Sequence, residues 1–156
     1  MSGPKTEVPE LSAKGRRVAI VAARFNDSIV SDLLEGARQA WAARGGEEGD
    51  LLILRVPGAF ELPVAAQACA NSGRFRAVVA LGCVIRGDTP HFEYVAGECA
   101  RGLQTVALQT GVPVAFGVLT VENERQALER SAPGSGNKGA EALESALEMI
   151  DVLTLT

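Results

Sequence analysis

The side chains best suited to acid–base chemistry lie in one short segment, Gly87-Asp88-Thr89-Pro90-His91. His91 is the only histidine of the chain, and an imidazole can take up or release a proton near neutral pH. Thr89 suits a helix N-cap and Pro90 the first helical position, which predicts that His91 lies in a first turn. Free N–H groups there attract anions and disfavour the imidazolium form, so we expect an anion-binding turn beside a neutral, proton-accepting histidine.

The same segment also fits two simpler interpretations. A single histidine is more often structural or merely exposed than catalytic, and a Gly-x-Thr turn commonly joins a strand to a helix without binding a ligand. The segment is neither a Walker phosphate loop nor a dinucleotide-binding glycine fingerprint, and we expect neither functional motif elsewhere in the chain. Its position in the fold therefore has to decide between function and structure.

Aromatic and charged side chains follow other predicted elements. Phe25 and Phe60 come soon after apolar runs, where each could stack on a planar ligand or belong to the core at a sheet edge. Glu61 suits either a helix start or the polar edge of a ligand. Arg130 and Lys138 flank a loop, where they are either ordinary surface charges or, for the arginine, the partner of an anionic substrate group.

The cysteines show no sign of a disulfide or a metal centre. Cys69, Cys83 and Cys99 form no Cys-x-x-Cys pair, which indicates a reduced protein, and we expect no metal. Cys83 lies eight residues before His91 and could form a nucleophilic Cys-His pair. We disfavour this interpretation because Cys83 belongs to an apolar strand, where a buried thiol behaves as a small hydrophobic group.

Apolar runs rich in valine and isoleucine alternate with helical patterns along the chain. The runs are typical of strands buried on both faces of a parallel sheet, and they cover 17–23, 51–56, 77–85 and 113–120. Helical patterns cover 30–41, 62–70, 94–108 and the C-terminal segment, with a loop at 132–136 before the last helix. The alternation predicts an α/β three-layer sandwich with a four-stranded, mainly parallel sheet flanked by helices on both faces.

Ligands of such open sheets bind beyond the carboxyl ends of the strands. This rule selects residues 24–26, 57–61 and 86–91, which contain both phenylalanines and the histidine segment. The position of the segment therefore favours its functional interpretation.

Length and composition narrow the class of protein. The 156 residues fit one domain over 17–156 after a polar N-terminal tail, 1–16, which lacks the apolar core of a signal peptide. A formal charge of -4 without a basic stripe argues against nucleic acid as a partner. No apolar run approaches the ~20 residues of a membrane span. We therefore expect a cytoplasmic protein without a membrane partner.

Six segments, taken in order along the chain, form a specific set. They are Arg24-Phe25-Asn26, VPGAFELP (56–63), ALGCVIRGDTPHFEYV (80–95), PVAFGVLT (113–120), ENERQALER (122–130) and NKGAEA (137–142). Together they resemble the 6,7-dimethyl-8-ribityllumazine synthase family of riboflavin biosynthesis, over nearly the whole chain after the tail. The resemblance implies a flavodoxin-like topology for the predicted sandwich.

The resemblance implies two small-molecule substrates, one of them phosphorylated. Members of the family condense 5-amino-6-(D-ribitylamino)uracil with 3,4-dihydroxy-2-butanone 4-phosphate. An imine forms, phosphate is eliminated and ring closure releases water. This chemistry requires proton transfer, a phosphate site and a stacking site but no cofactor. A functional link to riboflavin synthase is also implied.

The resemblance assigns roles to residues of this sequence. Proton transfer is assigned to His91 and stacking on the pyrimidine to Phe25. The other contacts to the pyrimidine and ribityl chain are implied for Ala59, Phe60, Glu61, Cys83, Val84, Ile85 and Phe116. Phosphate binding is implied for Asp88, Thr89 and Arg130, with Lys138 in a supporting electrostatic role.

Two positions depart from commoner spellings of the family. Phe60 stands where tryptophan is frequent, which keeps a stacking face. Asp88 places a negative charge beside the expected phosphate. We therefore expect the backbone N–H of Asp88 to bind the phosphate while its carboxylate turns away.

A homo-oligomer is implied as well. Members of the family assemble pentamers with sites at the subunit contacts, and some build sixty-subunit icosahedral shells. Phe116 matches a position that reaches into a neighbouring subunit's site, which implies at least a pentamer. The short segment between Arg130 and Asn137 favours a shell, although Pro133 and Gly134 weaken that inference.

Three other interpretations remain open at this point. An archaeal-type riboflavin synthase shares the fold, but the segment 87–91 and the Arg-Phe-Asn element favour the lumazine synthase. A receiver or flavodoxin module would need an acidic cluster or a Ser/Thr-rich loop after the first strand, where this chain has Ala-Ala-Arg-Phe. A family member kept mainly for flavin binding or shell formation, with weak catalysis, is compatible with the sequence.

Overall fold

The computed structural model describes residue 7 and residues 9–156, and within them the chain forms one four-stranded, all-parallel sheet. Its strands are β1 (Val18–Ala23), β2 (Leu51–Val56), β3 (Ala77–Ile85) and β4 (Val114–Val121), in the order β2-β1-β3-β4. The predicted sandwich is confirmed. β1 begins one residue later than predicted, and β4 both begins and ends one residue later than predicted. Most of the predicted tail, residues 1–6 and 8, lies outside the described residues.

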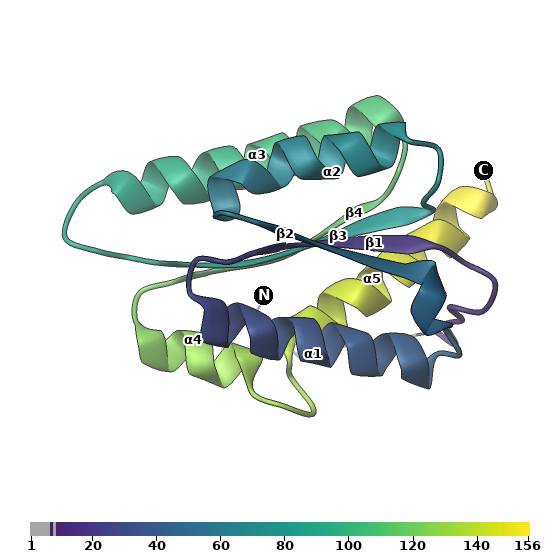
Figure 1. Cartoon of the computed structure of the whole chain (residues 1–156), viewed down its shortest axis with the longest axis horizontal. Helices are drawn as coiled ribbons and strands as arrows, with labels where there is room; N and C mark the ends of the chain where they lie inside the picture. The colour runs from purple at the N-terminus through teal and green to yellow at the C-terminus, as the bar shows by residue number, and fades with distance from the viewer. Residues whose placement is uncertain (1–6, 8) are drawn as a thin grey trace.

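Helices cover both faces of this sheet, as Figure 1 shows. On one face lie α2 (Leu62–Asn71) and α3 (His91–Thr110), and on the other α1 (Asp27–Ala43), α4 (Glu124–Ser131) and α5 (Lys138–Thr154). Short 3-10 turns, η1 (Glu48–Asp50) and η2 (Ala59–Glu61), precede β2 and α2. Among the described residues, no helix combines the length and apolarity needed to cross a membrane.

The central strand β1 explains why the sheet needs helices on both sides. All six of its residues are buried. Val18 and Ile20 pack into the core beneath α1 and α5, whereas Ala19 and Val21 pack into the core beneath α2 and α3. Alternate side chains of a strand point to opposite faces, so a continuous apolar run requires two apolar layers.

The helices α1 and α5 approach closely enough to exclude a side chain at their contact. A Cβ added to Gly139 would lie 1.9 Å from the carbonyl oxygen of Leu33. Beside it the buried Asn137 caps α5 by accepting from the Ala140 N–H at 3.0 Å, and its amide donates to the Ser131 carbonyl at 2.9 Å. These contacts fix the ends of α4 and α5 against α1.

The carboxyl ends of the strands continue into loops that remain hydrogen-bonded to one another. The Arg24 N–H donates to the Val56 carbonyl at 2.7 Å, and the Phe25 N–H to the Pro57 carbonyl at 3.1 Å. Parallel pairing thus extends beyond β1 and β2 and places residue 25 beside the segment that begins at residue 57. The fold brings the expected ligand-binding loops together at one edge.

Candidate active site

A pocket of about 730 Å³ opens at this edge of the sheet. Its lining includes nine of the predicted site residues: Phe25, Ala59, Phe60, Glu61, Cys83, Val84, Ile85, Thr89 and His91. They come from the loop after β1, from η2, and from the end of β3 with the turn that follows. Segments far apart in the sequence therefore meet at one concave surface, which is where parallel α/β sheets bind ligands.

Two phenylalanine rings on the pocket wall are left in solvent. The exposed fraction is 70% for Phe25 and 61% for Phe60. A core assignment of these rings is therefore wrong for the single chain. Large apolar rings gain free energy when a planar ligand or a second chain covers them. The pocket can accordingly hold a flat aromatic molecule between apolar surfaces.

Asn26 fixes the loop that carries Phe25. Its backbone has φ 60 and ψ 48, the left-handed conformation that asparagine tolerates better than most residues. Its side chain does not cap α1 but donates from Nδ2 to the Cys83 carbonyl at 2.9 Å. This bond ties the loop after β1 to the end of β3. This bridge was not predicted from the sequence, where an asparagine directly before a helix was the only signal.

The turn after β3 ends one residue later than predicted. Pro90 is the N-cap of α3 and His91 its first residue, whereas Thr89 had been expected at the cap. The Thr89 hydroxyl instead accepts from the His91 N–H at 3.4 Å. The cap lies one position later than predicted because it is the Pro90 carbonyl that accepts the first hydrogen bond of the helix, from the Glu93 N–H at 3.0 Å. His91 still lies at the helix start, exposed on the pocket wall.

Acidic residues at the pocket differ in their placement. Asp88 is exposed and is not among the residues that line the pocket. Glu61 is the N-cap residue of α2, but its carboxylate makes no capping hydrogen bond. It lies on the pocket wall instead. Only Glu61 of the two therefore presents a carboxylate to a ligand in this pocket.

The environment of Cys83 argues against a thiolate nucleophile. Cys83 is buried, and this burial raises its pKa from the ordinary 9.0 to about 11. The thiol is therefore protonated at neutral pH and is a poor nucleophile. Cys69 and Cys99 are also buried free thiols.

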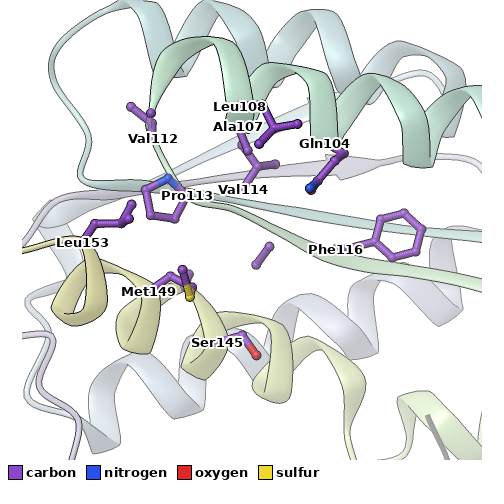
Figure 2. Close-up of a pocket in the computed structure, with 13 residues that line it drawn as sticks. Gln104, Ala107, Leu108, Val112, Pro113, Val114, Phe116, Ser145, Met149 and Leu153 are labelled. Carbon is purple, nitrogen blue, oxygen red and sulfur yellow. The ribbon is translucent and has the colours of Figure 1, made fainter. Parts of the chain in front are cut away.

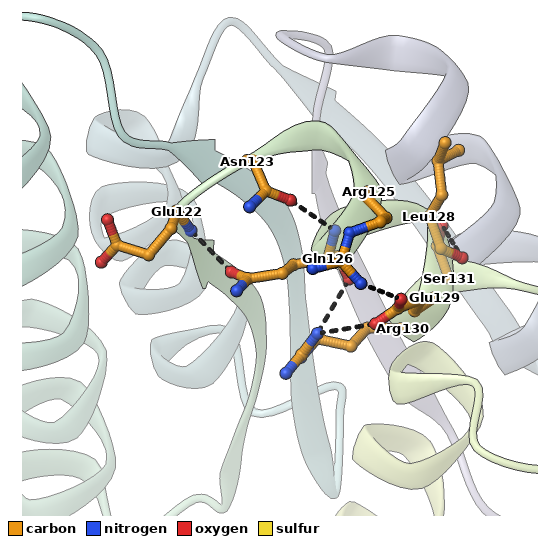
Figure 3. Close-up of polar contacts among 8 residues, drawn as sticks. All are labelled: Glu122, Asn123, Arg125, Gln126, Leu128, Glu129, Arg130 and Ser131. Carbon is orange, nitrogen blue, oxygen red and sulfur yellow. Dashed lines mark hydrogen bonds and ion pairs between the residues drawn. The ribbon is translucent and has the colours of Figure 1, made fainter.

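Three predicted site residues lie away from this pocket. Phe116 lines a second hollow of about 550 Å³ between α3, β4 and α5, shown in Figure 2. The guanidinium of Arg130 donates to the Gln126 carbonyl at 3.0 Å and lies 3.8 Å from a Glu129 oxygen, as Figure 3 shows. Lys138 pairs with Glu141 at 2.8 Å.

Other residues of the pocket were not assigned roles from the sequence. Phe92, Tyr94 and Val95, all in the first turns of α3, line it beside His91. Their signal was the helical spacing itself, because residues 91, 94 and 95 share one face of a helix. Tyr94 is 69% exposed. Across residues 7 and 9–156 no group of three or more histidine, cysteine or acidic side chains is placed to hold a metal ion.

One glycine pattern in the C-terminal region has the spelling of a dinucleotide-binding motif. The sequence GSGNKG (134–139) reads Gly-x-Gly-x-x-Gly. The functional motif joins a strand to a helix, whereas this one follows α4 and leads into α5. Gly139 is needed for the close contact with Leu33. Gly139 therefore serves helix packing, while Gly134 and Gly136 adopt a positive φ in the loop before α5.

Comparison with known proteins agrees with this geometry. The family model described as 6,7-dimethyl-8-ribityllumazine synthase matches residues 15–154. The 6,7-dimethyl-8-ribityllumazine synthase of Nitratidesulfovibrio vulgaris is 50% identical over 149 residues, which cover 96% of each chain. That of Thermus thermophilus is 52% identical over 150 residues, again 96% of each chain. The chain belongs to the 6,7-dimethyl-8-ribityllumazine synthase family.

Proposed function

We propose that this protein condenses 5-amino-6-(D-ribitylamino)uracil with 3,4-dihydroxy-2-butanone 4-phosphate to give 6,7-dimethyl-8-ribityllumazine in riboflavin biosynthesis. The observation that carries the proposal is the half-identity, over 96% of each chain, with relatives that bear the name of this activity. The pocket supports it, because two exposed aromatic rings and the only histidine line one cavity.

The pyrimidine substrate occupies the aromatic part of the pocket. Phe25 stacks on the pyrimidine ring, and Phe60 covers it or the ribityl chain beside Ala59. The Glu61 carboxylate accepts hydrogen bonds from ribityl hydroxyls, since it lies on the pocket wall without a capping bond. Backbone groups of Cys83, Val84 and Ile85 complete this subsite.

The phosphate of the four-carbon substrate binds at the turn before α3. N–H groups at a helix start suit an anion, and the Thr89 hydroxyl adds a donor. Asp88 contributes its backbone N–H, which fits the exposure of its side chain outside the pocket lining. Arg130 supplies the cation that a bound phosphate requires, with Lys138 as electrostatic support.

His91 transfers protons at this junction of the two subsites. Attack of the 5-amino group on the ketone gives an imine and water, elimination expels phosphate, and ring closure releases a second water. Each step moves a proton to or from nitrogen, carbon or oxygen, which a histidine within reach accelerates. Holding both substrates in one pocket supplies much of the remaining rate enhancement.

The catalytic unit is a homo-oligomer, at least a pentamer, with a sixty-subunit shell as the higher assembly. Phe116 and Arg130 do not line the pocket of their own chain. Both complete the site of a neighbouring subunit. In the family, the position that Phe116 matches reaches into a neighbouring subunit's site. The setting is cytoplasmic, and the product passes to a riboflavin synthase.

The activity is tested with the purified protein and both substrates. The fluorescence of the lumazine product should rise, and it should stay flat when either substrate is omitted. Supplying the lumazine alone should produce no riboflavin, which distinguishes this activity from that of an archaeal-type riboflavin synthase. A correctly assembled protein without turnover would contradict the proposal.

A further inference from the structure

We propose that Arg86 is a positioning residue that holds the turn 87–90 in its phosphate-binding form by linking β3, β4 and the start of α3. The inference rests on the proposed function. Arg86 touches neither substrate in this account. It acts through the turn and through Phe92.

Four contacts connect Arg86 to the elements around the turn. Its N–H donates to the Val121 carbonyl at 2.9 Å, which extends the pairing of β3 and β4. Its Nε donates to the Glu122 carboxylate at 2.7 Å, directly after β4. Its Nη1 donates to the Glu93 carboxylate at 3.2 Å, in the first turn of α3. Its Cζ lies 4.4 Å from the centroid of the Phe92 ring.

The turn itself has little else to hold its shape. Residues 87–90 are all exposed, and a Cβ added to Gly87 would meet no atom within 4 Å. The bonds from the His91 N–H to Thr89 and from the Glu93 N–H to Pro90 are local to the turn and the helix start. A side-chain bridge from residue 86 to residues 92 and 93 closes the loop that contains the phosphate site.

The charge of Arg86 is already engaged, which separates it from a phosphate ligand. Hydrogen bonds to Glu122 and then to Glu93 raise its pKa, so it remains a cation. Two carboxylates against one guanidinium leave no net positive charge, and Arg86 is absent from the pocket lining. Its neighbour Phe92 does line the pocket, so the ring transmits the position of Arg86 to the site.

Loss of Arg86 should therefore act selectively on the phosphorylated substrate. The turn would lose its bridge, and the Glu93 and Glu122 carboxylates would be left uncompensated near the bound phosphate. The rings of the pyrimidine subsite, Phe25 and Phe60, belong to the loop after β1 and to η2, whereas the Arg86 bridge joins the ends of β3 and β4 to the start of α3. If Arg86 had a purely structural role, its loss would weaken the binding of both substrates alike.

Arg86→Gln tests the proposal, with Arg86→Lys as the conservative variant. We expect Arg86→Gln to raise KM for the phosphorylated substrate about tenfold and to leave KM for the pyrimidine within about threefold. Arg86→Lys keeps the charge but loses the planar guanidinium that donates to two carboxylates. Its KM for the phosphorylated substrate should therefore lie between those of the wild type and Arg86→Gln. The matched control is Arg101→Gln, which removes an exposed arginine whose ion pair is with Glu98 on its own helix. It should change neither KM by more than about twofold.

Calorimetric titration with inorganic phosphate gives a readout that does not depend on turnover. Arg86→Gln should weaken phosphate binding about tenfold relative to the wild type. Unchanged KM and phosphate affinity in Arg86→Gln, or an equal rise of both KM values with a fall in Tm, would overturn the inference. If Arg86→Gln does not fold, an unaltered phosphate affinity in Arg86→Lys overturns it. A wild type that binds phosphate but forms no lumazine would count against the proposed function alone.

Discussion

His91 is exposed at the first position of α3, on the wall of a pocket that two solvent-exposed phenylalanines share. An imidazole there is within reach of a bound amine or carbonyl and can exchange protons with it. Replacement by alanine leaves the stacking rings and the helix start in place. Chemistry and binding are therefore separable at this residue.

His91→Ala should lower kcat by about 10²-fold while KM for each substrate changes little. Turnover persists because substrate positioning does not depend on the imidazole. Steady-state kinetics with the fluorescent product provide the measurement. Wild-type kcat in this variant would remove His91 from the proton-transfer role.

Asp88→Gly tests whether the backbone or the carboxylate of residue 88 serves the phosphate. The side chain is exposed and outside the pocket lining, and glycine keeps the backbone N–H that we propose binds the phosphate. We expect KM for the phosphorylated substrate to stay within a few-fold of the wild-type value. A rise in this KM of about 100-fold, roughly 2.7 kcal/mol, would show that the carboxylate takes part in binding the phosphorylated substrate.

Buried thiols make the folded chain sensitive to alkaline pH. Burial raises the pKa of Cys99 from 9.0 to about 11. The unfolded chain ionises first, so this contribution to stability is intact below pH 9 and is lost as pH rises from 9 towards 11. Chemical unfolding over this range should show a shallower decline for Cys99→Ala than for the wild type. Equal slopes would mean that the Cys99 thiol has an ordinary pKa.

At the residue level, the types and positions of residues predicted which side chains line the pocket better than they predicted the contacts between those side chains. Phe25, Phe60 and His91 were found because they follow apolar strands in a parallel sheet. The bridges made by Asn26 and Arg86 were not found, because each joins residues from different elements. Pairing of that kind depends on tertiary geometry, which a single sequence does not reveal.

At the level of elements, local pattern was sufficient for the strands and for α2, whereas α1 and α3 each begin three residues before and end two residues after the predicted 30–41 and 94–108. Continuous valine and isoleucine runs predicted β1 to β4 because both faces of this sheet are buried. The cap of α3 lies one residue later than predicted because the Pro90 carbonyl accepts the first hydrogen bond of the helix, from the Glu93 N–H. The tight contact of α1 with α5 at Gly139 was not anticipated, because glycine in a helix is not by itself a packing signal.

The contact of α1 with α5 at Gly139 can be tested with a matched pair of glycine substitutions. Gly139→Ala should destabilise the protein by more than about 3 kcal/mol, since the new Cβ would lie 1.9 Å from the Leu33 carbonyl oxygen. Gly97→Ala, within α3, meets no atom within 4 Å and should stabilise by about 0.5–1 kcal/mol. Denaturant unfolding of both variants provides the comparison. Similar stabilities would contradict the close approach of the two helices.

At the level of the whole molecule, two exposed apolar hollows lie in different places. One holds Phe25, Phe60 and His91, and the other holds Phe116 with Leu108 and Met149. A single chain that leaves so many large apolar side chains in solvent is typical of a subunit. Composition and periodicity describe one chain at a time, so the proposed subunit number rests on family resemblance rather than on pattern.

Mixed oligomers test whether Phe116 completes a neighbour's site. Variants His91→Ala and Phe116→Ala are each impaired, but co-expression should restore activity to about a quarter of the wild-type value if they assemble randomly in equal amounts. A quarter of the sites then combine an intact His91 from one subunit with an intact Phe116 from the next. Activity equal to the mean of the two variants would place both residues in the same chain's site.

The most direct test of the central claim is a crystal structure of the protein with 6,7-dimethyl-8-ribityllumazine and inorganic phosphate. We predict that the lumazine ring stacks on Phe25, with its ribityl chain along residues 59–61. The phosphate should be held by the N–H groups of residues 88 and 89 beside His91. A lumazine bound in the hollow around Leu108 and Met149, or a phosphate away from this turn, would contradict the account.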